Sequence, residues 1–211
     1  MHSELWKEDK SANITLYSHL LEEFGYDHRS LNWGSREGQY LRFEVLSQVY
    51  PLQGMKILDV GCGIGDFYDW ALKKGLEIDY TGIDITPLMI QKARQRFPGI
   101  TFRTADILDE SNLFEDTFDV VISSGIFAHR TFSPKDFLEN MTIKMFSLCE
   151  RALAFNTLSA WAPNPDEGEF YADPPETLAF CKTITPWVAL RHDYHARDFT
   201  IFMYHRRRAG L

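Results

Sequence analysis

The feature that most constrains this chain is an apolar run that leads directly into three closely spaced glycines. The run covers residues 56–60, and the glycines follow at alternate positions: Gly61, Gly63 and Gly65. Glycine has no Cβ, so this spacing allows a sharp turn and a close approach of a ligand to the backbone. Residues 66–74 then predict a helix that ends at Gly75. A strand, a glycine turn and a helix start form the first half of a nucleotide-cofactor site.

The glycine spacing and a nearby carboxylate distinguish between two classes of cofactor. The dinucleotide fingerprint is Gly-x-Gly-x-x-Gly, and it places a pyrophosphate on the helix N-terminus. In this chain the third glycine comes one residue early, and Asp59 stands two residues before the first one. A carboxylate there would repel a diphosphate, whereas a cationic ligand tolerates it. The sequence therefore favours a positively charged cofactor.

The stretch Asp-Val-Gly-Cys-Gly-Ile-Gly over residues 59–65 resembles motif I of the class I S-adenosylmethionine-dependent methyltransferases. The resemblance extends over about residues 35–205. The cofactor of that family carries a sulfonium and an ammonium in place of a diphosphate. The resemblance implies a cradle that includes Cys62, and methyl transfer by in-line displacement that releases S-adenosylhomocysteine.

Strand and helix patterns alternate along the chain after the glycine turn. Short apolar runs predict strands at residues 80–84, 100–103, 118–123, 151–158, 187–190 and 199–204. Helices are expected between most of them, and such alternation predicts a parallel sheet with helices on both faces. Few residues join the last two strands, which indicates an antiparallel hairpin. We expect an α/β fold with three layers, doubly wound around a mostly parallel seven-stranded sheet, as in the methyltransferase form of the Rossmann-like fold.

The first 50 residues have a different pattern from the rest. Apolar residues recur at helical spacing within residues 12–24, and Ser35 is placed to cap a second helix. We expect one methyltransferase domain over residues 1–211. Within it, residues 1–50 form an N-terminal helical cap or lid, and residues 51–211 form the cofactor-binding core.

Asp84 is predicted to bind the ribose of the cofactor. It ends the second predicted strand, about 20 residues beyond the glycine turn, where a carboxylate accepts hydrogen bonds from ribose hydroxyls. Ile85 follows it and is a candidate for packing on the adenine face. Asp106 follows the third predicted strand. The resemblance implies that Asp106 accepts from the adenine amino group and that the amide of Ile107 donates to a ring nitrogen, with Asp109 as a competing carboxylate.

Two further positions are assigned to the cofactor. Ser123 ends the fourth predicted strand, beside the point where doubly wound sheets bind their ligands. Arg42 lies on the second predicted helix, where some family members place an arginine that pairs with the cofactor carboxylate. A guanidinium suits such a bidentate contact. Arg36 is the competing choice.

His129 is the candidate general base. It lies a few residues past the fourth predicted strand, within reach of the expected pocket. An imidazole titrates near neutrality and can take a proton from an oxygen or nitrogen nucleophile. His192 and His195, near the terminal hairpin, are weaker candidates.

The longest irregular stretch, residues 159–175, is the candidate acceptor loop. Long loops inside compact domains are often functional. This one combines aromatic and acidic side chains, which suit an apolar or cationic small molecule. Trp161 and Tyr171 are the predicted substrate contacts, with Asp173 as a further candidate.

Composition limits the partners and the compartment. The net charge is −8, which argues against nucleic acid because phosphate binding needs clustered Lys and Arg. Three widely separated cysteines suit free thiols in a reducing compartment. No apolar run is long enough for a bilayer, and no His, Cys and carboxylate spacing indicates a metal. We therefore expect a cytoplasmic protein with a small-molecule substrate, no nucleic-acid partner, no membrane contact and no metal; the oligomeric state is left open.

Two other functions compete with methyl transfer. A nicotinamide-dependent oxidoreductase is disfavoured by the early third glycine, by Asp59 and by too little chain for a catalytic domain. A catalytically inactive protein that binds the cofactor for a regulatory purpose is disfavoured because the acidic and glycine positions are all present. Calorimetry with S-adenosylmethionine and with NAD(H) distinguishes a methyltransferase from a nicotinamide-dependent oxidoreductase.

Overall fold

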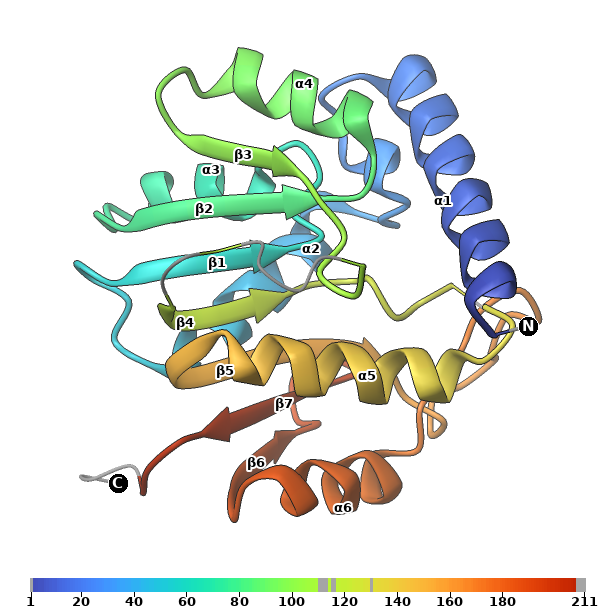
Figure 1. The fold of residues 1–211 in the computed structure, drawn as a ribbon, viewed down its shortest axis with the longest axis vertical. Helices are drawn as coiled ribbons and strands as arrows, with labels where there is room; N and C mark the ends of the chain where they lie inside the picture. The colour runs from blue at the N-terminus through green and yellow to red at the C-terminus, as the bar shows by residue number, and fades with distance from the viewer. Residues whose placement is uncertain (1, 110–113, 115–116, 130, 208–211) are drawn as a thin grey trace.

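One sheet of seven strands runs through the computed structural model, which describes residues 2–109, 114, 117–129 and 131–207. The strands lie in the order β3-β2-β1-β4-β5-β7-β6 (Figure 1). Their bounds are β1 Lys56–Val60, β2 Asp79–Asp84, β3 Thr101–Thr104, β4 Phe118–Ser123, β5 Cys149–Leu158, β6 Trp187–Arg191 and β7 Asp198–Tyr204. Strands β1 to β5 pair in parallel, and β7 pairs antiparallel with both β5 and β6. The predicted mostly parallel sheet with a terminal hairpin is confirmed.

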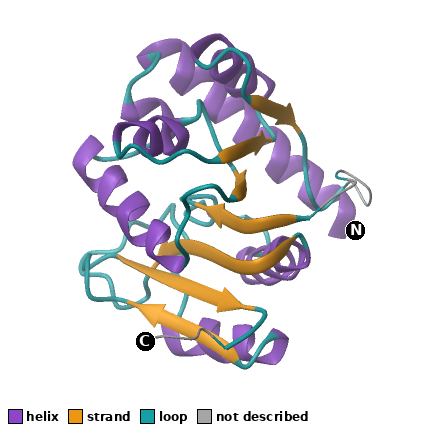
Figure 2. Ribbon diagram, turned by 90° about the vertical axis from the view of Figure 1, so that its left-hand side faces the viewer, coloured by secondary structure: helices purple, strands orange, loops and turns teal. Residues whose placement is uncertain are grey.

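Helices cover both faces of this sheet (Figure 2). The α-helices are α1 His2–Phe24, α2 Arg36–Leu46, α3 Asp66–Lys73, α4 Pro87–Arg96, α5 Pro134–Ser147 and α6 Pro174–Ile184, and two short 3-10 turns are η1 His28–Leu31 and η2 Ser47–Val49. Successive strand residues face opposite sides, so Ile57 joins the core under α2, α3 and α4, whereas Leu58 joins the core under α5 and α6. Within the described part of the chain, no helix has the length and apolar character needed to cross a membrane.

Helix α1 begins well before the predicted stretch of residues 12–24. Its first residues are mostly polar, so no apolar spacing marks them in the sequence. Tertiary contacts hold them instead: the Trp6 ring stacks on Phe137 of α5 with centroids 4.8 Å apart. The Lys10 amine also pairs with Asp106 and Asp109 beyond β3, at 2.9 and 2.7 Å.

The first 50 residues contribute two helices with different positions. Helix α1 lies on the side of the molecule toward which the arrows of β1, β2 and β3 point (Figure 1). Helix α2 packs on the sheet, and its Phe43 and Leu46 belong to the same buried core as Ile57. Ser35 caps α2 by accepting from the Gly38 amide, as predicted. Helix α1 is therefore the element that covers the carboxyl ends of the parallel strands.

Candidate functional site

A hollow of about 920 Å³, counted to its open mouth, lies where the carboxyl ends of β1, β2 and β4 meet α1. Small-molecule sites are usually concave and mostly apolar, with a few polar groups that orient the ligand. Several of the predicted site residues line it: Gly61, Asp84, Ile85, Asp106, Ile107 and His129. The cavity therefore lies at the strand ends where the doubly wound fold predicts a ligand.

The glycine turn forms the floor of this cavity beside β1. Gly61, Gly63 and Gly65 have φ angles of +77°, +53° and +81°, a region that favours glycine. The Gly61 amide donates to the Ile83 carbonyl at 2.8 Å and so holds the turn against β2. A Cβ at position 61 would lie 2.2 Å from Cγ2 of Ile126. Only glycine therefore fits between β1 and the wall that Ile126 forms.

Asp84 stands at the tip of β2 with its carboxylate held by backbone amides. Its Oδ2 accepts from the Gly63 amide at 2.9 Å, and its Oδ1 accepts from the Thr86 amide at 2.8 Å. Burial raises the pKa of Asp84, and these two amides oppose that rise. Each carboxylate oxygen has two lone pairs. Asp84 therefore keeps acceptor capacity for a ligand hydroxyl in the cavity.

Asp106 is the second carboxylate of the cavity and is buried. Its Oδ1 accepts from the Leu108 amide at 2.9 Å, and its Oδ2 lies 2.9 Å from Nζ of Lys10. The competing Asp109 is half exposed and does not line the cavity. Apolar side chains surround the two carboxylates: Ile85, Met89 and Ile107. These residues fit the cofactor that the sequence predicts. The carboxylates can accept hydrogen bonds from ribose hydroxyls and from an adenine amino group, and the apolar side chains can pack on a purine ring.

Asp59 and Cys62 lie next to the cavity without lining it. The Asp59 carboxylate is buried and accepts from the Tyr80 hydroxyl at 2.6 Å. Burial raises the pKa of the Cys62 thiol well above its usual range. Gly63 and Gly65 face the side chains of Leu31 and Phe102. These positions shape the turn, and their direct contact with a cofactor stays a prediction.

The buried Asp59 carboxyl predicts a pH-dependent stability. Burial raises the pKa of Asp59 from 3.8 to about 7, so between these pH values the native state keeps a proton that the unfolded state releases. The free energy of unfolding therefore falls as the pH rises through this window. An Asp59→Asn substitution removes this pH dependence. Across the window, the free energy of unfolding of the variant therefore rises relative to that of the wild type by up to about 1.4 kcal/mol per pH unit. Urea unfolding of both proteins across the window measures this, and parallel pH profiles would contradict it.

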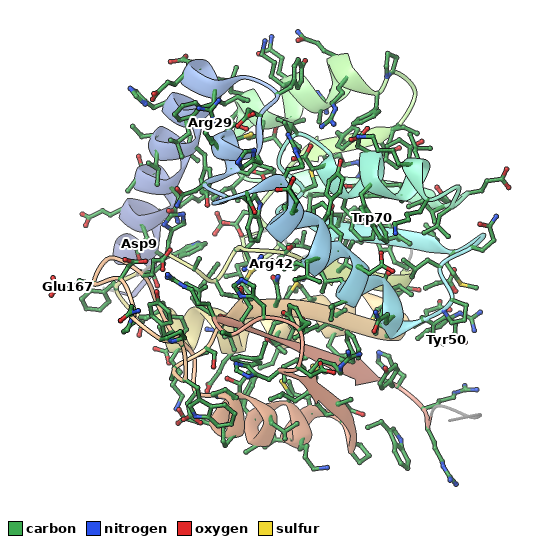
Figure 3. The ribbon with its side chains drawn as sticks, turned by 180° about the vertical axis from the view of Figure 1, so that it is seen from behind. Asp9, Arg29, Arg42, Tyr50, Trp70 and Glu167 are labelled. Carbon is green, nitrogen blue, oxygen red and sulfur yellow. The ribbon has the colours of Figure 1, made fainter. Side chains whose placement is uncertain are left out.

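Arg42 belongs to α2, and its side chain is buried in the interior of the molecule (Figure 3). Its Nε and Nη2 donate to the two carboxylate oxygens of Asp198, and its Nη1 donates to the Gly38 carbonyl at 2.6 Å. The guanidinium carbon lies 4.9 Å from the ring centroid of Trp33, which does line the cavity. The competing Arg36 pairs with Asp66 of α3 at 3.0 Å. Neither arginine lines the cavity, so the predicted contact with a cofactor carboxylate has no support in this geometry.

Ser123 and Ser124 have different roles at the end of β4. The Ser123 hydroxyl donates to the Val60 carbonyl at 2.8 Å and ties β4 to β1. The predicted Ser123 is buried and does not line the cavity, whereas Ser124 does. The Ser124 Oγ is buried and has no hydrogen-bond partner among the described residues. Side chains alternate along a strand, which is why adjacent serines end up on different sides.

His129 contacts Tyr17 of α1 inside the cavity. The Tyr17 hydroxyl lies 2.7 Å from Nε2 of His129, and the two rings meet edge to face with centroids 5.3 Å apart. Burial lowers the pKa of His129, and Glu169 partly opposes this. Burial also raises the pKa of Tyr17. At neutral pH the Tyr17 phenol therefore stays protonated and donates a hydrogen bond to the neutral imidazole of His129.

The predicted acceptor loop lies outside this cavity. Trp161 is 58% exposed and meets His192 edge to face. Tyr171 is held by Arg197, whose Nη2 lies 2.6 Å from its oxygen, and faces a separate depression with Asp173. The loop still touches the site indirectly. The Phe170 amide donates to the Ala128 carbonyl at 2.8 Å, and Glu169 forms an isolated antiparallel β-bridge with His129. The structure therefore uses this loop to support His129, and Trp161 and Tyr171 as substrate contacts stay unsupported predictions.

Several cavity residues have no clear signal in the sequence: Trp6, Asn13, Tyr17, Thr86, Phe137 and Met141. Most come from α1 and α5, whose apolar spacing is that of any packed helix. Tyr17 occurs within the apolar pattern of residues 12–24 and so reads as a packing residue. Its partner lies more than a hundred residues away. Trp33 lies in the loop before α2, where the sequence leaves a lid residue and a packing residue equally open; its place over Gly125 depends on tertiary packing.

Comparison with known proteins gives a consistent picture. The sequence model of a family described as "Methyltransferase domain" matches residues 51–157. The putative methyltransferase Rv1506c of Mycobacterium tuberculosis is 32% identical over 154 residues, which cover 70% of this chain and 91% of that protein. Phosphoethanolamine N-methyltransferase 3 of Arabidopsis thaliana is 36% identical over 140 residues, 59% of this chain, but this chain spans only 28% of that longer protein.

Solved structures share the fold. Magnesium protoporphyrin IX methyltransferase from Synechocystis, crystallised with S-adenosylhomocysteine, superposes with a TM-score of 0.62 at 14% identity, covering 92% of this chain and 94% of that one. A methyltransferase from Archaeoglobus fulgidus gives a TM-score of 0.62 at 15% identity, with 81% and 95% covered. At these identities the likeness is one of fold, and the family follows from the sequence matches above.

Proposed function

This chain belongs to the class I S-adenosylmethionine-dependent methyltransferases, and on that premise we propose that it methylates a small molecule bound in the cavity under α1. The cofactor is S-adenosylmethionine and the product S-adenosylhomocysteine. The observation that carries the proposal is the joint presence, in one cavity, of two strand-end carboxylates and of a histidine bonded to a tyrosine. The family assignment sets aside the nicotinamide-dependent and the inactive alternatives.

The cofactor, when bound, supplies a methyl group on a sulfonium with a thioether as the leaving group. In our proposal Asp84 accepts from the ribose hydroxyls, Asp106 accepts from the adenine amino group, and the amide of Ile107 donates to the ring. The apolar faces of Ile85 and Met89 pack on the purine. Helix α1 closes the cavity and excludes water, which aids alignment of the reacting groups.

His129 is proposed as the base, acting through Tyr17. Because Nε2 of His129 already accepts from the Tyr17 hydroxyl at 2.7 Å, a proton from the acceptor passes to the Tyr17 oxygen while Tyr17 gives its own proton to His129. The neutral imidazole that burial favours is the form that can receive it. Helix α1 thereby contributes a residue, Tyr17, to the proposed chemistry.

A small acceptor and a cytoplasmic location are parts of the same proposal. The names of two similar proteins specify small acceptors, phosphoethanolamine and magnesium protoporphyrin IX. The three cysteines of this chain are all free and buried, which suits a reducing compartment. We further propose that residues 1–211 form a single unit with an N-terminal segment, residues 1–50, on a core of residues 51–211. In this segment α1 acts as the cap of the cavity, whereas α2 packs on the sheet of the core.

The cofactor contact of Asp84 has a direct test. An Asp84→Ala substitution is expected to weaken S-adenosylmethionine binding by roughly 1–3 kcal/mol, because it removes charge-assisted hydrogen bonds. Isothermal titration calorimetry measures the dissociation constant, and Asp84→Asn, which keeps the shape of the side chain, gives a second value. Asp79→Asn, at the exposed opposite end of β2, is the matched control. An unchanged dissociation constant in both Asp84 variants would remove this residue from the site.

A further inference from the structure

The cavity divides into two chemically different halves on either side of β1. On the β2 side stand both carboxylates, Asp84 and Asp106, with apolar neighbours that include Ile85, Met89 and Ile107. On the β4 side stand the residues that follow this strand and the facing parts of α1 and α5: Trp6, Trp33, Ser124, Ile126, Phe137 and Met141. Since β2 and β4 flank β1 in the sheet, the two groups lie on opposite sides of the glycine turn. Tyr17 lies between the two groups: its ring packs against the cluster that contains Met89, and its hydroxyl meets His129. The β4 side, together with His129 and the Tyr17 hydroxyl, is called the acceptor half below.

The acceptor half carries aromatic walls. Trp6 and Phe137 stack at 4.8 Å with their planes 28° apart. Trp33 lies so close to Gly125 that a Cβ there would be 2.9 Å from the indole, and the Arg42 guanidinium supports the same ring at 4.9 Å from its centroid. Rings held in this way keep their orientation. They offer flat, rigid faces that suit a planar ligand.

The acceptor half has no charged lining side chain among the described residues. His129 is held neutral by burial, which lowers its pKa. Two cations that the structure describes near the cavity are already paired: Arg42 with Asp198 behind Trp33, and Lys10 with Asp106 on the cofactor side. An anionic group placed here would lose its water without gaining a cation from the described lining side chains, at a large cost in free energy.

Two polar atoms in this half lack a partner. Nε1 of Trp6 and Oγ of Ser124 are buried and form no hydrogen bond with any described group. Buried polar groups normally find a partner, and an oxygen of a ligand in the cavity would supply one for each of these two atoms. The Trp6 nitrogen can only donate, whereas the Ser124 hydroxyl can donate or accept.

From these observations, and resting on the proposed function, we infer that the methyl acceptor is an uncharged planar ring compound that is methylated on a hydroxyl oxygen. The O–H bond breaks and its proton passes to Tyr17 and on to His129. A new bond forms between that oxygen and the methyl carbon, and the electron pair of the breaking carbon–sulfur bond stays on sulfur. The flat walls favour a ring, and the two atoms without a partner favour neutral oxygens. The lack of an unpaired cation among the described residues that line this half disfavours acids.

The test compares two compounds that differ by one carboxylate, 2-naphthol and 6-hydroxy-2-naphthoate. Each is titrated by calorimetry into the full chain saturated with S-adenosylhomocysteine. We expect 2-naphthol to bind at least about tenfold more tightly, which corresponds to an unpaired charge left in the cavity. Equal or tighter binding of the acid, or binding of neither compound, overturns the inference. Failure of S-adenosylhomocysteine itself to bind would instead overturn the proposed function, so the two failures are distinguishable.

A second measurement uses Trp6→Phe, which keeps the stack on Phe137 and removes only the N–H group. The variant is expected to bind 2-naphthol about three- to tenfold more weakly than the wild type, the usual effect of one hydrogen bond. Trp187→Phe, at an exposed position of β6, is the matched control. Equal affinity in all three proteins would overturn the role given to the Trp6 nitrogen.

Discussion

Replacing His129 by glutamine is expected to lower kcat by about 10²–10⁴-fold, the usual contribution of a positioned general base. Glutamine keeps a polar side chain of similar length but cannot take a proton. The dissociation constant of S-adenosylmethionine should stay the same, because His129 faces the acceptor half. Release of S-adenosylhomocysteine under saturating cofactor measures kcat, and calorimetry measures cofactor binding.

Two further variants make this result specific. Tyr17→Phe breaks the proposed proton path while keeping the ring, so it should lower kcat in the same direction as His129→Gln. His19→Gln, at an exposed position of α1, should leave kcat unchanged. A wild-type kcat in both His129→Gln and Tyr17→Phe would exclude the pair from the chemistry.

The pH profile gives an independent check on the same pair. Burial lowers the pKa of His129 from its ordinary value of 6.5, and only the neutral imidazole acts as a base. The wild-type kcat is therefore expected to fall as the pH drops through this lowered pKa, and to stay level just above it. This acid limb should be absent from the residual activity of His129→Gln.

The second large effect is expected from Asp198→Asn. This substitution leaves the Arg42 guanidinium buried without its carboxylate, and breaking a buried ion pair in this way costs about 3–5 kcal/mol. The loss adds to that of the His195 contact, whose Nδ1 lies 2.7 Å from the same carboxylate. Urea unfolding gives the free energy. Asp193→Asn, which breaks the exposed pair with Arg191, is the matched control and should cost at most about 1 kcal/mol.

The partner of Asp198 in this ion pair, Arg42, has two possible roles that a substitution can distinguish. The sequence predicts that Arg42 binds the cofactor carboxylate, whereas the structure commits its guanidinium to Asp198 behind Trp33. If the structural role holds, Arg42→Met destabilises the protein while the affinity for S-adenosylmethionine changes little at a temperature where the variant is folded. A loss of more than about tenfold in affinity, with modest destabilisation, would restore the predicted role.

Much of the fold was predictable because local patterns determine it. The apolar run before Gly61 marks β1, and the alternation of strands and helices leaves few ways to build a sheet. The same rule brings Asp84 and Asp106 together, because both follow parallel strands whose carboxyl ends meet at one edge of the sheet.

Other parts of the site depend on contacts between distant segments. Tyr17 and His129 are separated by 112 positions, and Arg42 and Asp198 by 156. No local pattern records which distant side chain will lie opposite a given residue. Tyr17 therefore resembled a packing residue, and Arg42 resembled a ligand for the cofactor.

The sequence by itself determined the methyltransferase fold, the glycine turn at Gly61 and the two carboxylates at the strand ends. The glycine turn and the strand-end carboxylates follow from backbone geometry and from periodicity along short segments, and the methyltransferase form of the fold follows from the resemblance of residues 59–65 to motif I. Only the tertiary structure decided that α1 covers the cavity, that Ser124 and not Ser123 faces it, and that Tyr17 meets His129 there. Those features depend on how separate helices pack on the finished sheet, and side-chain packing is a property of the whole folded chain.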